Sequence, residues 1–318
     1  MIRAEEEGGS GRPRVGLYLH EGVPTARIAR LAERLGFDYG TCGEHLLFHQ
    51  PVPNSLIRLA AAAGATERLL LLSSLTLAPL YPAALLAKMT AELDVVSGGR
   101  FSLGVGVGGE FAPEFEAVGI PVGERGARTD EALELLVRLL SEREVSFDGR
   151  FNRLRDFTIE PPAVQAPRPP LWVGGRSGPA IRRAARFADA WLPYFITPAR
   201  LRQGTEALGE QAVAAGRAAN DLETAVFLFT SVDRDRERAR EMARRSLGGS
   251  YRQDVSGLVD KYMLAGTPGE CRQKLAEYTG AGAGTVVFSL ACPAEKAEGM
   301  AAMLAEDVLG LTPRGAGR

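Results

Sequence analysis

The stretch GGRFSLGVGVGGEF, from Gly98 to Phe111, decides between two α/β folds. It contains the spacing G-x-G-x-x-G at Gly104, Gly106 and Gly109, which in dinucleotide-binding folds brings a backbone turn close to a pyrophosphate. That motif belongs after the first strand of such a fold and opens a helix, whereas three strand-and-helix units precede it here and EFAPEF, which follows, is not a helix opening of that type. The alternation of glycine with valine over residues 104–108 instead predicts a strand. Its thin glycine face would let a flat ligand or a neighbouring backbone approach closely.

On both sides of this stretch, short apolar strands alternate with amphipathic helices. We expect strands at 14–19, 37–46, 69–77, 100–107, 169–175, the end of 178–195, 222–232 and 284–290. The helices expected between them include 24–36, 54–66, 82–99, 129–142 and 267–280. Eight such units with no break in composition predict a single (β/α)8 TIM barrel over residues 14–312, after a flexible N-terminal tail at 1–13.

Two intervals, 110–128 and 144–165, are too long for ordinary connections in a compact domain. We expect both to be insertion loops at the C-terminal face of the barrel, where they would cover the active-site end. Trp172 and Trp191 lie in expected strands and are interpreted as core or barrel-interior aromatics.

The composition excludes several classes of function. The 38 basic and 39 acidic side chains leave a net charge of -1, so no nucleic-acid partner is indicated. No stretch approaches the roughly eighteen apolar residues that span a bilayer, and no secretory h-region is seen. Three cysteines at unrelated spacings and three scattered histidines make neither a disulfide framework nor a metal site, which fits a cytoplasmic protein without metal. Neither G-x-S-x-G nor H-E-x-x-H occurs.

Two short segments attract attention on chemical grounds. Glu44 and His45 end the second strand, at the barrel end where catalytic residues collect, although a lone histidine there can also be a satisfied polar residue. The segment GGRS, residues 174–177, joins the fifth strand to a helix. Glycine N–H groups, a helix N-terminus, an arginine and a hydroxyl can together hold a phosphate, and the alternative is a simple turn.

From about Val15 to Leu290 the sequence resembles the bacterial luciferase-like flavin and deazaflavin oxidoreductases. The segments that carry the resemblance are RLGFDYGTCGEHLL (34–47), SSLTLAPLYPAALLAKMTAELDVVSGGRFSLGVGVGG (73–109), RTDEALELL (128–136) and LWVGGRSGPAIRRAARFADAWL (171–192). The resemblance implies a barrel that holds FMN or the deazaflavin coenzyme F-420 at the C-terminal ends of its strands.

The resemblance also assigns roles to residues. His45 would face the reactive edge of the ring and donate or accept a proton, and Glu44 would orient it; His20 and His49 are weaker candidates. In relatives a bulged third strand supports the ring, often with a non-prolyl cis peptide, which by this placement would be Leu75-Thr76; ordinary strand packing is the alternative. The residues expected to bind the cofactor are Ser74, Leu75, Thr76, Gly108, Gly109, Gly174, Gly175, Arg176 and Ser177.

Three functions follow from the resemblance. GEH (43–45) is similar to the S-D-H segment of deazaflavin enzymes, which favours F-420-dependent hydride transfer to or from a small organic substrate. The alternative is a monooxygenase that uses reduced FMN from a partner flavin reductase, and a second alternative is a non-catalytic flavin-binding subunit. A homodimer is expected by family analogy. A barrel of unrelated chemistry would bind no flavin.

Overall fold

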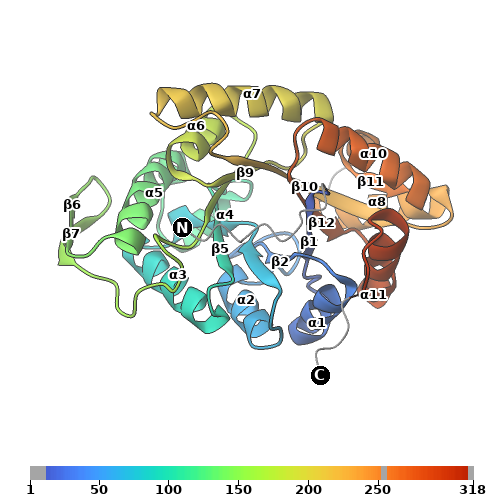
Figure 1. Ribbon diagram of the computed structural model, residues 1–318, viewed down its shortest axis with the longest axis horizontal. Helices are drawn as coiled ribbons and strands as arrows, with labels where there is room; N and C mark the ends of the chain where they lie inside the picture. Colours follow the sequence, from blue (N-terminus) through green and yellow to red (C-terminus); the bar gives the residue numbers. More distant parts are fainter. Residues whose placement is uncertain (1–11, 252–255, 314–318) are drawn as a thin grey trace.

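A computed structural model describes residues 12–251 and 256–313, so most of the expected tail, residues 1–11, lies outside the described residues. Within them, eight parallel strands form a ring at the centre of the molecule (Figure 1). They are β1 (Arg14–Tyr18), β2 (Tyr39–Cys42), β3 (Leu70–Ser73), β5 (Phe101–Gly106), β8 (Leu171–Gly174), β9 (Ala190–Leu192), β10 (Glu223–Val232) and β12 (Thr285–Leu290). Because β10 pairs with β9 as well as with β12, the order β10-β12-β1-β2-β3-β5-β8-β9 closes on itself. The predicted TIM barrel and the positions of its eight strands are confirmed.

Helices surround the ring (Figure 1). They are α1 (Thr25–Leu35), α2 (Ser55–Ala63), α3 (Ala83–Ser97), α5 (Arg125–Ser141), α6 (Gly178–Phe187), α7 (Pro198–Ala214), α8 (Arg236–Tyr251), α9 (Ser256–Tyr262), α10 (Pro268–Gly280) and α11 (Ala294–Met303). Local sequence fixes several ends: Gly36 stops α1 in the left-handed conformation, and Thr267 with Glu270 forms a capping box on α10. Smaller elements include β4 (Thr76–Leu77), β11 (Leu264–Gly266), the 3-10 helix η1 (Ala78–Leu80) and the π-helix η3 (Leu304–Val308).

Two apolar layers hold the barrel together. One lies inside the ring and consists of Tyr39, Leu72, Trp172, Ala190, Leu192, Ala225 and Val287. The larger layer lies between the strands and the helices, and it includes the fully buried Trp191. Both tryptophans are therefore core residues, as expected. Trp191 occupies the space that a side chain on Gly204 of α7 would need.

The first long interval does lie at the C-terminal end of the strands. It begins at Glu110 and forms the short helix α4 (Ala112–Ala117) and the 3-10 helix η2 (Val122–Glu124) before α5 starts. Helix α4 could not be expected from the sequence, because EFAPEF lacks an amphipathic pattern long enough to recognise.

The expectation for the second interval, 144–165, is wrong. Residues in it form an antiparallel hairpin of β6 (Val145–Asp148) and β7 (Arg153–Phe157), which projects beyond α5 at the edge of the molecule (Figure 1). The segment joins the end of α5 to the start of β8, so it leaves the barrel at the end opposite to the active-site face. Its turn is fixed by Glu131 of α5, whose carboxylate accepts hydrogen bonds from the backbone N–H groups of residues 150–152.

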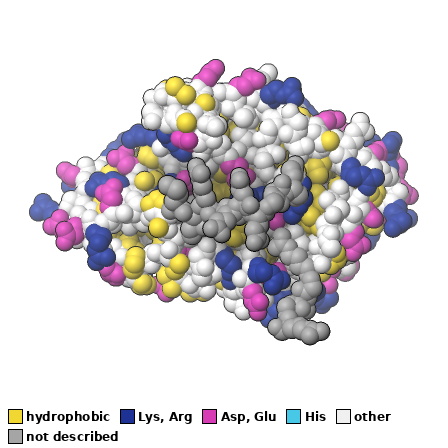
Figure 2. Space-filling view, viewed as in Figure 1, with side chains coloured by type: hydrophobic (Ala, Val, Ile, Leu, Met, Phe, Trp, Pro, Cys, Tyr) yellow, Lys and Arg dark blue, Asp and Glu magenta, His cyan; other side chains and the backbone are white. Residues whose placement is uncertain are grey.

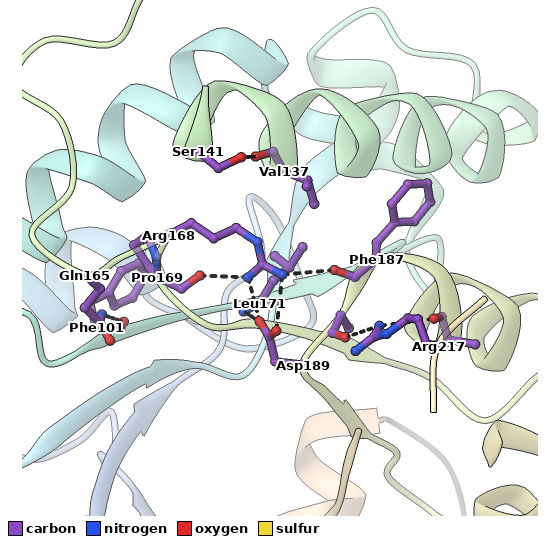
Figure 3. A network of polar contacts seen from close by, with 12 residues as sticks. Phe101, Val137, Ser141, Gln165, Arg168, Pro169, Leu171, Phe187, Asp189 and Arg217 are labelled. Atoms are coloured by element: carbon purple, nitrogen blue, oxygen red, sulfur yellow. Dashed lines mark hydrogen bonds and ion pairs between the residues drawn. The ribbon is translucent and has the colours of Figure 1, made fainter. Parts of the chain in front are cut away.

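A polar network closes the barrel where β8 and β9 begin, at that opposite end. Figure 3 shows the guanidinium of Arg168 between the Asp189 carboxylate and the carbonyls of Pro169 and Phe187. Asp189 also accepts a hydrogen bond from the N–H of Leu171 at 2.7 Å. The network satisfies polar groups at the start of both strands.

Basic and acidic side chains are interspersed over the visible face of the molecule (Figure 2), in keeping with the near-zero net charge. In the part of the chain that is described, no helix is both long enough and apolar enough to cross a membrane.

Candidate active site

A cavity of about 590 Å³ opens at the C-terminal ends of the barrel strands. Residues from or just after β1, β2, β5, β8, β9, β10 and β12, and from the β3–β4 segment, line it. Nine of the eleven predicted site residues are among the lining: Glu44, His45, Ser74, Leu75, Gly108, Gly174, Gly175, Arg176 and Ser177. Thr76 and Gly109 are not. The fold therefore brings most of the predicted residues, which lie far apart in the sequence, to one cavity.

The third barrel strand is interrupted at the cavity. After β3 ends, the Ser74-Leu75 peptide is cis, and the strand resumes as β4, in which Thr76 pairs with Val105. The expected cis bond at Leu75-Thr76 is thus displaced by one residue. Thr76 is fully buried, with its hydroxyl 2.9 Å from that of Ser55, so it is a packing residue behind the cavity.

The glycine row at residues 104–108 leaves space for this interrupted segment of the third strand. A side chain on Gly104 would overlap the carbonyl oxygen of Ser73, and one on Gly174 of the next strand would overlap the methyl group of Leu75. A glycine face can admit either a flat ligand or a neighbouring backbone. Here it admits the neighbouring chain, and the Leu75 side chain fills the space. Glycine is required at position 109 for a different reason, because Gly109 adopts a φ of 98° and lies against the Arg125 side chain.

The expectation that Glu44 orients His45 is wrong. Glu44 is buried, and one carboxylate oxygen accepts hydrogen bonds from the Asn54 amide, the Tyr81 hydroxyl, and both the N–H and the hydroxyl of Ser55. Its other oxygen accepts from the N–H of Leu77 at 3.0 Å. Glu44 therefore joins the end of β2 to the start of α2 and to β4, which is a structural role.

The carboxylate that contacts His45 belongs to Glu114 of α4. Its oxygens lie 3.3 and 3.2 Å from the His45 Nδ1, and one also accepts from the N–H of Leu46. The Glu114 side chain is completely buried, while that of His45 is 19% exposed. Because Nδ1 is engaged by the carboxylate, the opposite ring nitrogen, Nε2, remains for a group in the cavity.

Aromatic contacts fix the plane of the His45 ring. Phe48 stacks on it with centroids 4.3 Å apart, and Phe111 contacts Phe48 edge-on at 6.1 Å. At the rim, surrounding protein atoms desolvate Glu110 and raise its pKa, an effect that His45 and Arg176 oppose. The loops after β2 and β5 thus form one wall of the cavity.

The GGRS segment connects β8 to α6 in the expected way. Ser177 caps the helix by accepting a hydrogen bond from the N–H of Ala180, and Gly175 adopts a φ of 101°. Arg176 donates hydrogen bonds to the carbonyls of Tyr194 and Phe195 from Nη1. The start of a ten-residue helix and a guanidinium therefore adjoin the cavity, which is an arrangement that attracts anions.

Sequence reasoning missed Glu114. The only signal was its place in an interval expected to cover the site, and that interval also contains Glu110, Glu116 and Glu124. Only the fold shows which of the four is buried against the imidazole. His20 lines the cavity, whereas His49 packs on Phe111 outside it. Among the described residues, no group of three or more histidine, cysteine, aspartate or glutamate side chains could hold a metal ion.

Comparison with known proteins gives the family. The sequence model of the luciferase-like monooxygenase family matches residues 12–285 of this chain. The FMNH(2)-dependent dimethylsulfone monooxygenase of Pseudomonas putida is 28% identical over 246 residues, which cover 76% of this chain and 66% of that protein. The F-420-dependent glucose-6-phosphate dehydrogenase of Beutenbergia cavernae is 34% identical over 226 residues, which cover 67% and 66%. The chain thus matches slightly less than two thirds of the length of these curated relatives.

A solved structure agrees over a longer span. Monooxygenase RslO1 from Streptomyces bottropensis superposes with a TM-score of 0.82 and 26% sequence identity, over 93% of this chain and 99% of that one. Together with the closed barrel and its interrupted third strand, the matches establish that the chain belongs to the luciferase-like monooxygenase family.

Proposed function

We propose that this protein is an oxidoreductase that binds a flavin-type cofactor in the barrel cavity and transfers a hydride between coenzyme F-420 and a small organic substrate. The observation that carries the proposal is the His45 imidazole, which lines the cavity and is hydrogen-bonded through Nδ1 to the buried Glu114. Relatives named for F-420 and for FMNH(2) support a flavin-type cofactor.

The cavity lining fits a flat ring that carries a phosphate. The Ser74–Leu75 segment and Gly108 present no long polar side chain to the space, which suits the face of an extended ring. Gly175, Arg176 and Ser177 lie where α6 begins, and they would hold the phosphate through backbone N–H groups, the guanidinium and the hydroxyl. Both FMN and F-420 carry such a phosphate.

When bound, the deazaflavin ring supplies a hydride acceptor or donor at carbon. The protein must then move the accompanying proton. In the direction of alcohol oxidation, the His45 Nε2 takes the hydroxyl proton as the carbon gives up its hydride, and in reduction it returns that proton to the carbonyl oxygen. Glu114 holds the imidazole in the tautomer that this exchange needs and stabilises the imidazolium that forms.

Use of reduced FMN from a partner reductase is the second candidate, favoured by the relative named as a monooxygenase. The same residues would serve it, since His45 would lie beside the ring and the GGRS segment would hold the phosphate. The two reactions would therefore differ in the cofactor bound and not in the residues that bind it.

An anaerobic titration tests the proposal. The purified protein is titrated separately with F-420 and FMN, each oxidised and reduced, and binding is followed by absorbance and fluorescence. We expect F-420 to bind at least tenfold more tightly than FMN in either state. Preferred binding of reduced FMN would favour the monooxygenase reaction over hydride transfer. Binding of neither cofactor would contradict the proposal as a whole.

A further inference from the structure

We infer that the substrate of this cavity is an uncharged, mainly apolar molecule with a single carbonyl or hydroxyl oxygen. The inference excludes substrates that carry a phosphate or carboxylate. It rests on the proposed function, because the oxygen is the group that would meet His45.

The positive charge available to a substrate is small. Among the described residues that line the cavity, Arg176 is the one arginine, and no lysine lines it. That guanidinium donates to two backbone carbonyls and adjoins the start of α6, the position assigned to the cofactor phosphate. An anionic substrate would need further charge-assisted hydrogen bonds, and the described lining supplies no second cation for them.

The hydrogen bonds of His20 make it a neutral group. Its Nδ1 accepts a hydrogen bond from the N–H of Gly22 at 3.1 Å, so that nitrogen carries no proton. Its Nε2 lies 2.9 Å from the carbonyl oxygen of Cys292 and therefore donates to it. Both nitrogens are used, and His20 does not offer a positive charge to the cavity.

The rim of the cavity is acidic. Glu21 and Glu110 line it and belong to the loops after β1 and β5, and Glu21 is exposed. The carboxylates of these two residues repel an approaching anion, most strongly at low ionic strength.

An aromatic wall, formed by Tyr18, Tyr194, Phe227 and Phe229, makes up another side of the cavity. Phe227 and Phe229 alternate along β10, so both side chains point to the same side of the strand. Phe227 meets Tyr18 edge-on at 6.0 Å and Phe229 at 5.4 Å. These rings are only half-buried, and an apolar substrate would remove their remaining surface from water.

Binding of matched probes tests the inference without relying on turnover. We would measure 2-hexanone, hexyl phosphate and glucose 6-phosphate by saturation-transfer difference NMR, on the protein alone and on the protein loaded with F-420. The ketone and hexyl phosphate share an apolar chain and differ in charge. We expect 2-hexanone to bind at least tenfold more tightly than either phosphate; equal or tighter binding of a phosphate would overturn the inference.

Variants test where the ketone and the phosphate probes bind. Phe229→Ser should weaken 2-hexanone binding about tenfold, and Phe229→Leu, which keeps an apolar side chain, less than threefold. Phe157→Ser, on the distant hairpin, is the control and should change nothing. Glu21→Lys, on an exposed loop, should strengthen hexyl phosphate binding severalfold. Unchanged ketone affinity in Phe229→Ser, or unchanged phosphate affinity in Glu21→Lys, would contradict the assignment.

The cofactor titration distinguishes a failure of the proposed function from a failure of the inference about the substrate. A protein that binds neither F-420 nor FMN but still prefers the ketone would contradict the proposed function and not the inference. A protein that binds a cofactor and prefers a phosphate would contradict the inference alone.

Discussion

The imidazole Nδ1 of His45 and the carboxylate of Glu114 lie 3.2 Å apart, although 69 residues separate them in the chain. One follows β2 and the other lies on the short helix α4 after β5. Since the carboxyl ends of parallel barrel strands meet at one face, both loops reach the same cavity. The contact places a fully buried carboxylate behind the one histidine that is assigned to proton transfer.

Replacing Glu114 tests that pairing. Glu114→Gln removes the charge but keeps the shape, so we expect cofactor affinity to remain within about twofold while kcat falls by tenfold or more and the pH profile of kcat shifts. The matched control is Glu116→Gln, two residues away on the exposed side of the same helix. Equal turnover for the wild type and Glu114→Gln would remove Glu114 from the mechanism.

His45→Ala separates an enzyme from a cofactor-binding subunit. General acid–base groups contribute on the order of 10²–10⁴-fold, so turnover should fall by at least about 100-fold while F-420 still binds. Added imidazole should restore part of the rate. A variant that loses neither turnover nor binding would contradict the catalytic assignment of His45.

Glu44 should behave as a structural residue. In Glu44→Gln the new amide N–H group faces buried donors, and we expect a loss of about 2 kcal/mol in the free energy of unfolding. Urea denaturation measures that loss. If Glu44→Gln instead kept wild-type stability and lost turnover, the structural role would be wrong.

Gly174 should tolerate no side chain while Leu75 is present. Gly174→Ala forces the methyl group into Leu75, which should cost about 1–3 kcal/mol of stability and weaken cofactor binding. The double variant with Leu75→Ala should recover part of the loss, because the overlap disappears. Gly299→Ala, on the exposed side of α11 with no atom nearby, serves as the control and should be neutral or stabilising.

The thiols should be inert in the folded protein. Cys42, Cys271 and Cys292 are buried, and burial raises the pKa of each to about 12, so the reactive thiolate is scarce at pH 8. Mass spectrometry after iodoacetamide treatment should find no alkylation of the native protein and three modified cysteines in urea. Rapid alkylation of the native protein at pH 8 would contradict the burial of these side chains.

The barrel could be predicted from the sequence because each strand is a short apolar run and each helix has its own periodicity and end signals. Gly36 and the Ser177 cap are local features, and local features survive in a single sequence. The GGRS segment could be placed for the same reason, since the glycine pair ends an apolar strand and Ser177 caps the helix that follows.

The errors concern contacts between distant segments. The hairpin at 145–157 lies at the opposite end of the barrel from the one expected, although the expected helix 129–142 and strand 169–175 already place this interval before a strand; its length alone does not indicate the active-site face. Glu44 and His45 are neighbours in sequence, but adjacent side chains near a strand end point in different directions. Glu114 cannot be identified from the sequence, because burial of a carboxylate depends on packing that no local pattern records.

A crystal structure of the protein with F-420 bound, prepared without oxygen, would show where the ring and its phosphate lie. We expect the ring against Ser74 and Leu75, its reactive edge toward the His45 Nε2, and its phosphate at residues 175–177. A ring bound elsewhere, or a phosphate far from the start of α6, would rule out the proposed cofactor site.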